Sequence, residues 1–422
     1  MLRIFMVLLI LSALVLAQNK EEKNIQFPKT YLERREALLQ SLGEGIAVLY
    51  SQGIETETGY RADGNFWYLT GVDERGAILL LAPQEQIRQV LFLPPRDVEI
   101  ERWIGRRPSL SDSLRKALGF EEIMRTGELD EVLIANLKHT SILQLISSLV
   151  GPSGYLPPDL DLYQKIMVRV PGTYVKNSSQ QIETMRMLKS AAEISAIEKA
   201  IQITYLGMTD MLAGVRPGVK EYQLDGILEN SFKRQGAQYM SFDPIIGTGE
   251  ESTILHYQKR DRSVEPGQLP LVDVGAEWEH YAADITRTFP VDGKFNPEQA
   301  HIYDVVLKAL KSATGIIKPG ITTRDVEDRV RTVIREAGYI DALIHGTCHH
   351  LGLDVHDVAD YGMKLKPGMV VTVEPGIYFP DKKFGVRIED DVLVTESGYR
   401  ILSEQIPRER SDVEAWIIRA KR

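Results

Sequence analysis

The sequence predicts an N-terminal α/β domain followed by a larger α+β domain whose two halves are related by a pseudo-twofold repeat. Apolar strand-like runs alternate with charged helical stretches up to about residue 175, and landmark residues recur about 101 positions apart beyond residue 200. The 422 residues are 43% hydrophobic and 26% charged, which is ordinary for a folded chain of two or three domains.

Charge and cysteine content narrow the possible classes. A formal net charge of −9 argues against a nucleic-acid-binding protein, because neutralising phosphates requires a basic face. Cys348 is the single cysteine, so no intrachain disulfide can form. The chain must therefore be stable without disulfides, which its length allows.

Residues 1–17 have the composition of a secretory signal peptide. Arg3 gives a basic start, residues 4–17 are nearly all apolar, and the run ends in Ala17 before polar Gln18. This apolar stretch is short for a bilayer core of about 30 Å. We expect export to the periplasm or out of the cell, with membrane anchoring if the segment stays uncleaved.

The first domain is expected at 25–175 and the second at 180–415. The sequence predicts a helical start at 31–39, strands at 45–50, 76–82 and 90–93, and charged helices at 111–118 and 128–138. A boundary is expected at Pro171-Gly172. Residues 176–179 are expected to be a linker, and a long helix is expected from Gln180.

The second domain contains a weak internal repeat. Four landmarks recur in one order at offsets of 100 to 102 residues: Arg216-Pro-Gly-Val219 with Lys318-Pro-Gly-Ile321, His256 with His356, Pro266-Gly267 with Pro367-Gly368, and Asp273 with Glu374. A Pro-Gly pair alone is common in loops. The shared order instead predicts a duplicated half-domain that brings polar residues together in matched pairs.

Two predicted hairpins each bring two acids face to face. A four-residue loop at 277–280 places Asp273 opposite Asp284, and a loop of the same length at 380–383 places Glu374 opposite Glu389. Opposed side chains in a sheet have Cβ atoms about 4.5–5.5 Å apart, so like charges there repel. Buried, these acids would have to share protons or surround cations. The alternative is that each lies on a solvated strand face.

Four of the eight histidines lie within twelve positions, at 345–356, and glycines in this segment predict a loop. Four carboxylates and an imidazole form a hard, oxygen-rich ligand set that suits a pair of divalent ions such as Mn²⁺, Co²⁺ or Zn²⁺. Two such ions about 3.5–4 Å apart activate a bridging water for amide hydrolysis. The remaining histidines would stabilise the tetrahedral intermediate and move protons.

These motifs resemble those of the pita-bread metallopeptidases, in the branch of Xaa-Pro aminopeptidase (aminopeptidase P) and prolidase. Residues 273–289 resemble the two-aspartate hairpin, 345–357 the histidine loop, and 374–378 and 387–390 the last two ligand motifs. The resemblance implies a pita-bread second domain with five metal ligands: Asp273, Asp284, His349, Glu374 and Glu389.

The resemblance also implies roles for other side chains. His256 and His356 would contact the scissile carbonyl or the tetrahedral centre, His345 and Arg387 would shape the site, and Glu374 would exchange protons with the bridging water. Supporting positions behind these groups are expected for Tyr378 and Asp354, and a packing role for Cys348.

Residues 61–71 and 96–107 resemble the amino-terminal domain of aminopeptidase P proteins. In that family this domain supports oligomers and closes the substrate cleft, which implies that Trp103 reaches a neighbouring subunit. The alternative is that Trp67 and Trp103 are both core residues. We expect a homo-oligomer, either a dimer or a tetramer.

The expected activity is that of an exopeptidase, most consistent with Mn²⁺, that removes the residue before proline from peptides with proline in second position. The close alternative is a prolidase, which cleaves only Xaa-Pro dipeptides. Two further alternatives on the same fold are a hydrolase of non-peptide substrates, such as organophosphate esters, and a non-catalytic binding protein. The binding protein predicts lost ligands, whereas all five ligand positions are occupied by ligand residues here.

Overall fold

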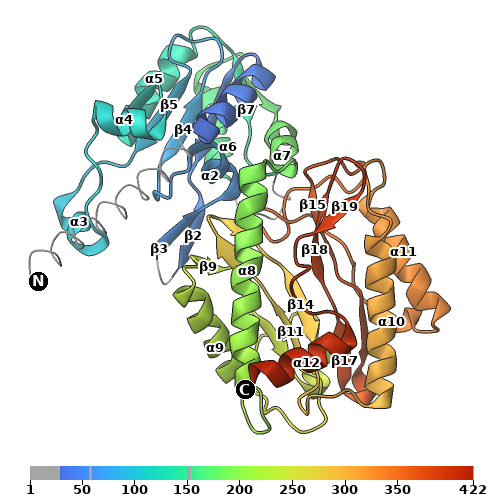
Figure 1. Cartoon of the computed structure of the whole chain (residues 1–422). Helices are drawn as coiled ribbons and strands as arrows, with labels where there is room; N and C mark the ends of the chain where they lie inside the picture. The colour runs from blue at the N-terminus through green and yellow to red at the C-terminus, as the bar shows by residue number, and fades with distance from the viewer. Residues whose placement is uncertain (1–28, 57–58, 150–153, 155, 422) are drawn as a thin grey trace, which may run out of the picture. The chain divides into compact units, whose positions relative to one another are not determined.

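The computed structural model describes residues 29–56, 59–149, 154 and 156–421, in two compact units that divide between Thr184 and Met185 (Figure 1). The expected signal segment at 1–17 lies outside the described residues. Within the described part of the chain, no helix combines the length and the apolar composition needed to cross a bilayer.

A six-stranded mixed sheet forms the centre of the first unit, in the order β6-β5-β4-β1-β7-β8. The inner strand β4 pairs antiparallel with both β5 and β1. The outer pairs, β5 with β6, β1 with β7 and β7 with β8, are parallel. The sheet contains β1 (Ile46–Tyr50), β4 (Ile78–Leu81), β5 (Gln89–Leu93), β6 (Glu122–Arg125), β7 (Ile142–Leu145) and β8 (Tyr174–Asn177). The strands predicted at 45–50, 76–82 and 90–93 are present.

Helices surround this sheet, and a separate hairpin precedes the second helix. The helices lie at 29–42, α2 (Gly64–Thr70), α3 (Val98–Ile104), α4 (Asp112–Leu118), α5 (Leu129–Asn136) and α6 (Pro158–Arg169), with a 3₁₀ turn η1 (Thr126–Glu128) and the hairpin β2 (Gly53–Thr56) and β3 (Gly59–Ala62). Leu133 of α5 and Tyr163 of α6 belong to the same core as the strands.

The two tryptophans differ in environment. Trp67 in α2 is 6% exposed and meets Tyr31 edge-on at 5.5 Å between ring centroids. Trp103 in α3 is 89% exposed. Core packing therefore describes Trp67 and not Trp103.

The expected linker at 176–179 and the long helix from Gln180 are wrong. Residues 176–179 contain the end of β8 and the start of α7 (Ser179–Met187), and a new helix, α8 (Ala191–Gly214), follows. The break arises because Ser190 caps α8. Its hydroxyl accepts from the Glu193 N–H, and the Glu193 carboxylate accepts from the Ser190 N–H.

Two helix pairs repeat in the second unit. α8 packs on α9 (Glu221–Arg234), and α10 (Pro297–Thr314) packs on α11 (Thr323–Glu336). The Gly218 N–H donates to the Val264 carbonyl at 2.8 Å, and the Gly320 N–H donates to the Leu365 carbonyl at 2.9 Å. The two halves thus form the same turn contact about 101 residues apart, as the predicted duplication requires.

Short strands lie between these helices, in three three-stranded sheets, β10-β11-β14, β13-β12-β9 and β15-β18-β19, and in a two-stranded ladder, β16-β17. The strands are β9 (Tyr239–Met240), β10 (Ile245–Gly247), β11 (Leu271–Val274), β12 (Ala276–Trp278), β13 (Tyr281–Ala282), β14 (Ile285–Thr288), β15 (Val370–Val373), β16 (Gly376–Phe379), β17 (Phe384–Arg387), β18 (Asp390–Val394) and β19 (Tyr399–Ile401). The 3₁₀ turns are η2 (Gly249–Thr253), η3 (Ile340–Ala342) and η4 (Pro380–Lys382).

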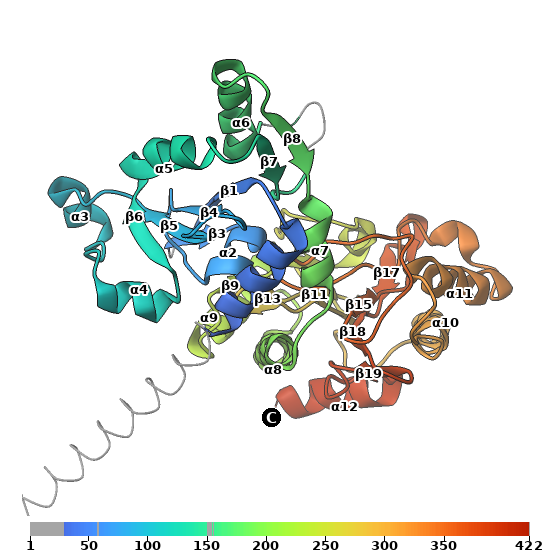
Figure 2. The same cartoon turned by 90° about the horizontal axis from the view of Figure 1, so that it is seen from above.

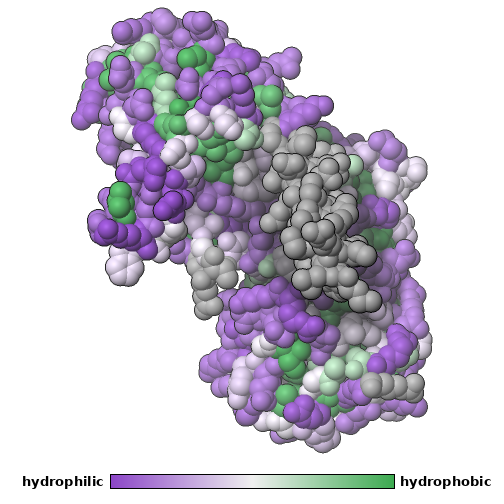
Figure 3. Space-filling view, turned by 60° about the vertical axis from the view of Figure 1, so that its left-hand side comes forward, coloured by the Kyte–Doolittle hydropathy of each residue, from purple (hydrophilic) through white to green (hydrophobic). Residues whose placement is uncertain are grey.

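A last helix, α12 (Arg410–Ala420), packs on α8 and α10. Figure 2 shows α8, α12 and α10 along one side of the strands of this unit. In Figure 3, hydrophilic residues cover most of the face in view, and hydrophobic residues form small separate groups on it.

One of the two predicted hairpin registers is confirmed and the other is wrong. Phe379 pairs with Phe384, as expected for a four-residue loop. In the first hairpin Trp278 pairs with Tyr281, so the loop has two residues, Glu279 and His280, both with positive φ. The pairing therefore shifts by two residues, and Asp273 faces Thr286 rather than Asp284.

Candidate metal centre

The side chains singled out from the sequence line one cavity of about 1040 Å³ in the second unit. Its walls include the five predicted ligands, Asp273, Asp284, His349, Glu374 and Glu389, and the other predicted site residues, His256, His345, His356 and Arg387. The structure thus brings together residues that are up to 133 positions apart, the separation of His256 and Glu389.

Three of the carboxylates stand where strands are interrupted. Asp284 lies in the two-residue break between β13 and β14, Glu374 follows β15, and Glu389 directly precedes β18. Other segments satisfy their backbone N–H groups: Asp284 donates to an Asp391 carboxylate oxygen, Glu374 to the Thr347 carbonyl and Glu389 to the Thr286 carbonyl. These contacts fix the direction of each side chain without a regular ladder.

The acids are buried rather than placed on a solvated strand face. Asp273, Asp284 and Glu389 are 8%, 5% and 1% exposed. Burial, reinforced by neighbouring carboxylates, raises the pKa of Asp284 and of Glu389 well above the ordinary value. Burial also raises the pKa of Glu374 to about 7. Without cations, this cluster can persist only by taking up protons.

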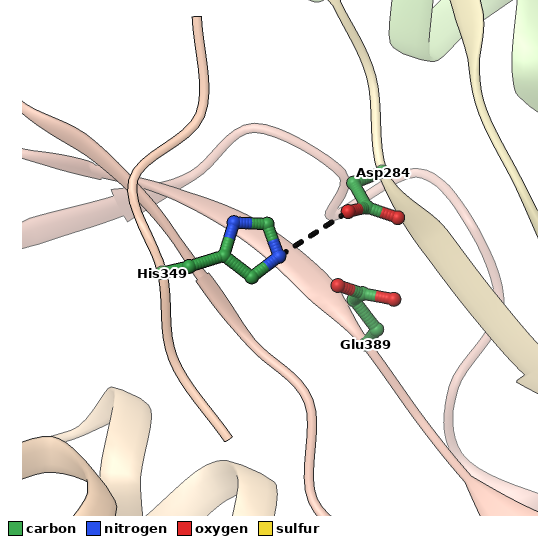
Figure 4. A group of neighbouring side chains, drawn as sticks. All are labelled: Asp284, His349 and Glu389. Carbon is green, nitrogen blue, oxygen red and sulfur yellow. Dashed lines mark ion pairs between the residues drawn. The ribbon is translucent and has the colours of Figure 1, made fainter. Parts of the chain in front are cut away.

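His349 presents a free nitrogen to the acids. Its Nδ1 lies 3.0 Å from the His350 carbonyl, to which it donates, so the neutral ring keeps a lone pair on Nε2. That atom lies 3.4 Å from Asp284 Oδ2, the pair that is dashed in Figure 4. It also lies 3.5 Å from Glu374 Oε1. Carboxylate oxygens only accept hydrogen bonds when ionised, so these three atoms need a proton or a cation among them.

The donor set fits a divalent ion. Ligand atoms of Asp284, His349 and Glu389 all lie within 4.8 Å of one another. Asp273 Oδ1 is buried and has no hydrogen-bond partner among the residues that the structure describes. Oxygen-rich sites with one imidazole suit Mn²⁺, Co²⁺ or Zn²⁺. His349 also has the backbone partner on its second nitrogen that metal-ligating histidines have in most sites.

Arg387 organises one wall of the cavity. Its Nη2 donates to Asp273 Oδ2 at 2.7 Å and its Nη1 to the Tyr378 hydroxyl at 2.9 Å. Nε donates to Thr286 Oγ1 at 3.1 Å, and that hydroxyl donates to Glu389 Oε2 at 2.7 Å. One buried guanidinium thus orients two predicted ligands, Asp273 directly and Glu389 through the Thr286 hydroxyl.

The other histidines differ in environment. His345 Nδ1 donates to the Gly346 carbonyl while Nε2 accepts from the Tyr378 hydroxyl at 2.9 Å, and burial beside Arg387 lowers the pKa of His345 to about 4. The His356 ring meets the His349 ring at 4.3 Å between centroids, and burial lowers the pKa of His356. His256 lies exposed on the cavity wall.

Apolar side chains and the cysteine complete the lining. Phe242, Ile245, Leu255 and Val355 contribute apolar surface, and Tyr361 lies at an exposed position. Cys348 is buried, and burial raises the pKa of its thiol. A protonated thiol is consistent with the packing role expected of it.

The sequence did not point to several residues that support the predicted ligands. Thr286, Arg287, Asp390 and Asp391 are all buried, and Arg287 donates to the Glu389 carbonyl and to Asp390 Oδ1. The Asp390-Asp391 pair directly after Glu389 was the signal that could have identified two of them. Arg287 is more than 100 positions away from these acids, so no local pattern links them.

Comparisons with known proteins agree with this geometry. Residues 195–396 match the model of metallopeptidase family M24, and residues 31–144 match the aminopeptidase P N-terminal domain. Xaa-Pro aminopeptidase of Escherichia coli is 32% identical, over 93% of this chain and 98% of that protein. Xaa-Pro dipeptidase of Pyrococcus furiosus is 39% identical, over 54% of this chain and 66% of that protein.

Among solved structures, zinc-substituted E. coli aminopeptidase P in complex with product superposes with a TM-score of 0.84 and 32% identity, covering 94% of this chain and 99% of that one. Both predicted domain types, the fold class and the enzyme class are therefore confirmed. The chain belongs to metallopeptidase family M24, in the group formed by the aminopeptidase P proteins.

Proposed function

We propose that this chain hydrolyses the peptide bond between an N-terminal residue and a proline in second position. The observation that carries the proposal is the free Nε2 of His349 facing Asp284 and Glu374 in a buried acidic cavity. The E. coli relative, which matches over almost its full length, bears the name of this activity.

The five acidic and histidine ligands would hold two divalent ions, of which we propose Mn²⁺. Such ions supply an activated water and stabilise the oxygens of the tetrahedral intermediate. The choice of Mn²⁺ over Co²⁺ or Zn²⁺ rests on the hard oxygen ligands alone. Reconstituting metal-free protein with each ion in turn and comparing kcat/KM would establish the preferred metal.

Side chains of the cavity would transfer the proton, bind the carbonyl oxygen and position the ligands. Glu374, which borders the cavity with a side chain 16% exposed, would accept the proton of the attacking water. His256 and His356 would donate hydrogen bonds to the carbonyl oxygen as negative charge develops on it. Arg387 and Tyr378 would hold Asp273 and His345 in position.

A prolidase remains the second candidate. The P. furiosus dipeptidase is 39% identical over 54% of this chain, a higher identity than the 32% of the E. coli protein over 93% of the chain. With Mn²⁺ supplied, Xaa-Pro and Xaa-Pro-Yaa peptides separate the two activities. Our proposal requires cleavage of the tripeptides, and cleavage of dipeptides alone would establish the prolidase instead.

A peptide-library digestion with Mn²⁺ tests the proposal as a whole. The wild type should release single N-terminal residues only where proline follows, and Asp284→Ala should abolish that release. Full activity of Asp284→Ala would contradict the assignment of this cavity. Cleavage at other peptide bonds would contradict the proposed proline specificity, and hydrolysis of organophosphate esters alone would favour the non-peptide alternative.

We also propose a homo-oligomer. Val98, Ile100 and Trp103 of α3 are 66%, 44% and 89% exposed, an apolar group that a second copy of this chain would cover. Light scattering after size exclusion should give a dimer or tetramer for the wild type and a smaller species for Trp103→Glu.

We further propose that the chain is exported. The support is the apolar run at 4–17 after a basic start. N-terminal sequencing of protein recovered outside the cytoplasm should begin near Gln18, whereas a cytoplasmic protein that retains Met1 would contradict export.

A further inference from the structure

The loop that carries His349 and His356 lacks the support of regular structure. In the described chain, residues 351–369 form no helix or strand. Up to Gly352 the loop is held by backbone hydrogen bonds: Thr372 N–H donates to the His349 carbonyl, Leu351 N–H to Val370, and Ala282 N–H to Gly352. Beyond Gly352 other contacts must fix the path to His356.

Asp357 provides such a contact. Its N–H donates to the His350 carbonyl at 3.0 Å, which closes the loop on itself. Its carboxylate lies 2.5 Å from Arg186 Nη2 and 3.0 Å from Lys189 Nζ. The three side chains are 1% to 2% exposed, so this is a buried cluster of one acid and two cations.

Both cations lie at the junction of α7 and α8, which backbone contacts hold in place. Arg186 is in the last turn of α7, and Lys189 lies in the break before α8, where its N–H donates to the Gly368 carbonyl. Arg186 also donates a hydrogen bond to Asp354 Oδ2 at 2.8 Å, so it binds the loop at a second residue. The Glu193 carboxylate, which belongs to the cap of α8, accepts a hydrogen bond from the Tyr281 hydroxyl at 2.7 Å. The next residue, Ala282, is the one whose N–H donates to the Gly352 carbonyl.

The fit against the loop is tight. A Cβ on Gly352 would lie 2.0 Å from Asp357 Oδ2 and 2.9 Å from Lys189 Cε. The carboxylate and the Gly352 backbone thus occupy adjoining space, and any side chain at this position must displace the acid. Asp357 directly follows His356, so a shift of the acid moves that imidazole.

We propose that Asp357, held by Arg186 and Lys189, is a positioning residue that fixes the path from His349 to His356 and so aims both imidazoles into the acidic cavity. The expected effect on kcat rests on the proposed peptidase activity. The expected effect on the conformation of the loop does not depend on the substrate. None of the three residues lines the cavity, so each acts through the loop.

Two independent perturbations test this role. Asp357→Asn removes the charge and keeps the shape, whereas Gly352→Ala keeps the charge and displaces the carboxylate. Both should lower kcat by about 10- to 100-fold, as observed for groups that orient ligands from behind, with KM little changed. Arg186→Lys, which keeps the charge, should recover part of the rate lost in Arg186→Gln.

Asp225→Asn is the matched control. It also replaces a paired aspartate by asparagine, in a partly buried ion pair in which Asp225 Oδ2 lies 3.3 Å from Arg260 Nε. Neither residue lines the cavity. Asp225→Asn should leave kcat unchanged. In a His356→Ala background, Asp357→Asn should lower kcat by a smaller factor than in the wild type, because the part of its effect that passes through His356 is already lost. A full multiplicative loss would overturn the positioning role.

Amide hydrogen exchange of metal-free protein gives a readout that needs no activity. Exchange at 349–357 should rise in Asp357→Asn and Gly352→Ala and stay unchanged in Asp225→Asn. Unchanged exchange and kcat in both loop variants would refute the inference. Altered exchange in a protein that cleaves no Xaa-Pro peptide would leave the inference standing and refute the proposed function.

Discussion

His349 Nε2 lies 3.4 Å from Asp284 Oδ2, too far for a good hydrogen bond and with no proton between the two atoms when the ring is neutral. The Nδ1 proton of His349 is used by the His350 carbonyl. A lone pair and a carboxylate that face each other in a buried cavity need a cation or a proton between them. This relationship is the central support for a metal centre here.

Thr286→Val should weaken metal binding by about 10- to 100-fold, because the Thr286 hydroxyl orients Glu389 and accepts from Arg387. The change keeps the side-chain volume and removes both contacts. Titration with Mn²⁺ measures the effect. Thr314→Val, which replaces another buried threonine that lines no part of the cavity, should bind as the wild type does. Equal affinities for all three proteins would count against the role of Thr286.

Arg387→Lys should lower kcat/KM by about 10- to 100-fold, because an ammonium cannot reproduce the planar fork that reaches Asp273, Tyr378 and Thr286 together. Steady-state kinetics on a Xaa-Pro-Yaa peptide measure this. Tyr378→Phe removes one of these contacts and should have a smaller effect. If the lysine variant keeps the wild-type rate, the fork is not needed.

Gly275→Ala should destabilise the protein by about 1–3 kcal/mol, the usual cost of overpacking. A Cβ there would lie 1.7 Å from the Ala283 carbonyl oxygen, and the strain falls directly beside Asp284. Gly226 in α9 is the matched control, since nothing lies within 4 Å of its Cβ position. Gly226→Ala should stabilise the chain by up to about 1 kcal/mol. Urea unfolding of both variants distinguishes these opposite signs.

Asp357→Asn should lower the free energy of unfolding by about 3–5 kcal/mol at pH 7, because it takes the ionised partner away from the buried Lys189 ammonium and removes one of the two acids that pair with Arg186. Burial alone would raise the pKa of Asp357, but the charges of Lys189 and Arg186 outweigh it and lower the pKa. The stability that this carboxylate contributes is therefore present above the unfolded-chain pKa of about 3.9 and lost as the pH falls through the lower folded value.

Urea unfolding of wild type and Asp357→Asn from pH 7 to pH 3 measures this linkage. The difference in the free energy of unfolding should stay constant down to about pH 4 and narrow below it. A difference that grows on acidification would mean that the carboxylate is not ionised in the folded protein.

The sequence predicted the site residues better than their pairing. The second hairpin has the expected register because Lys383, with φ of 57°, ends a four-residue loop that the strands on either side define clearly. In the first hairpin, Glu279 and His280 adopt positive φ in a two-residue turn. Neither residue type signals such a turn, which Asn-Gly would. The local sequence pattern therefore predicted that Asp273 faces Asp284, two residues away from its actual partner, Thr286.

The residues that hold the site from behind could not be predicted. Arg186 and Asp357 are 171 positions apart, and Arg287 and Asp390 are 103 apart. Each looks like an ordinary charged residue in the sequence. Only the folded chain shows that all four are buried and paired, because burial of a charge depends on long-range partners that periodicity does not reveal.

The most direct test of a cation site between His349 and the acids is the number of ions bound. Protein freed of metal by a chelator and dialysed against Mn²⁺ should hold two ions per chain by atomic emission, and Asp284→Asn should lose at least one. A wild type that retains no metal after dialysis, while it remains folded, would contradict the account.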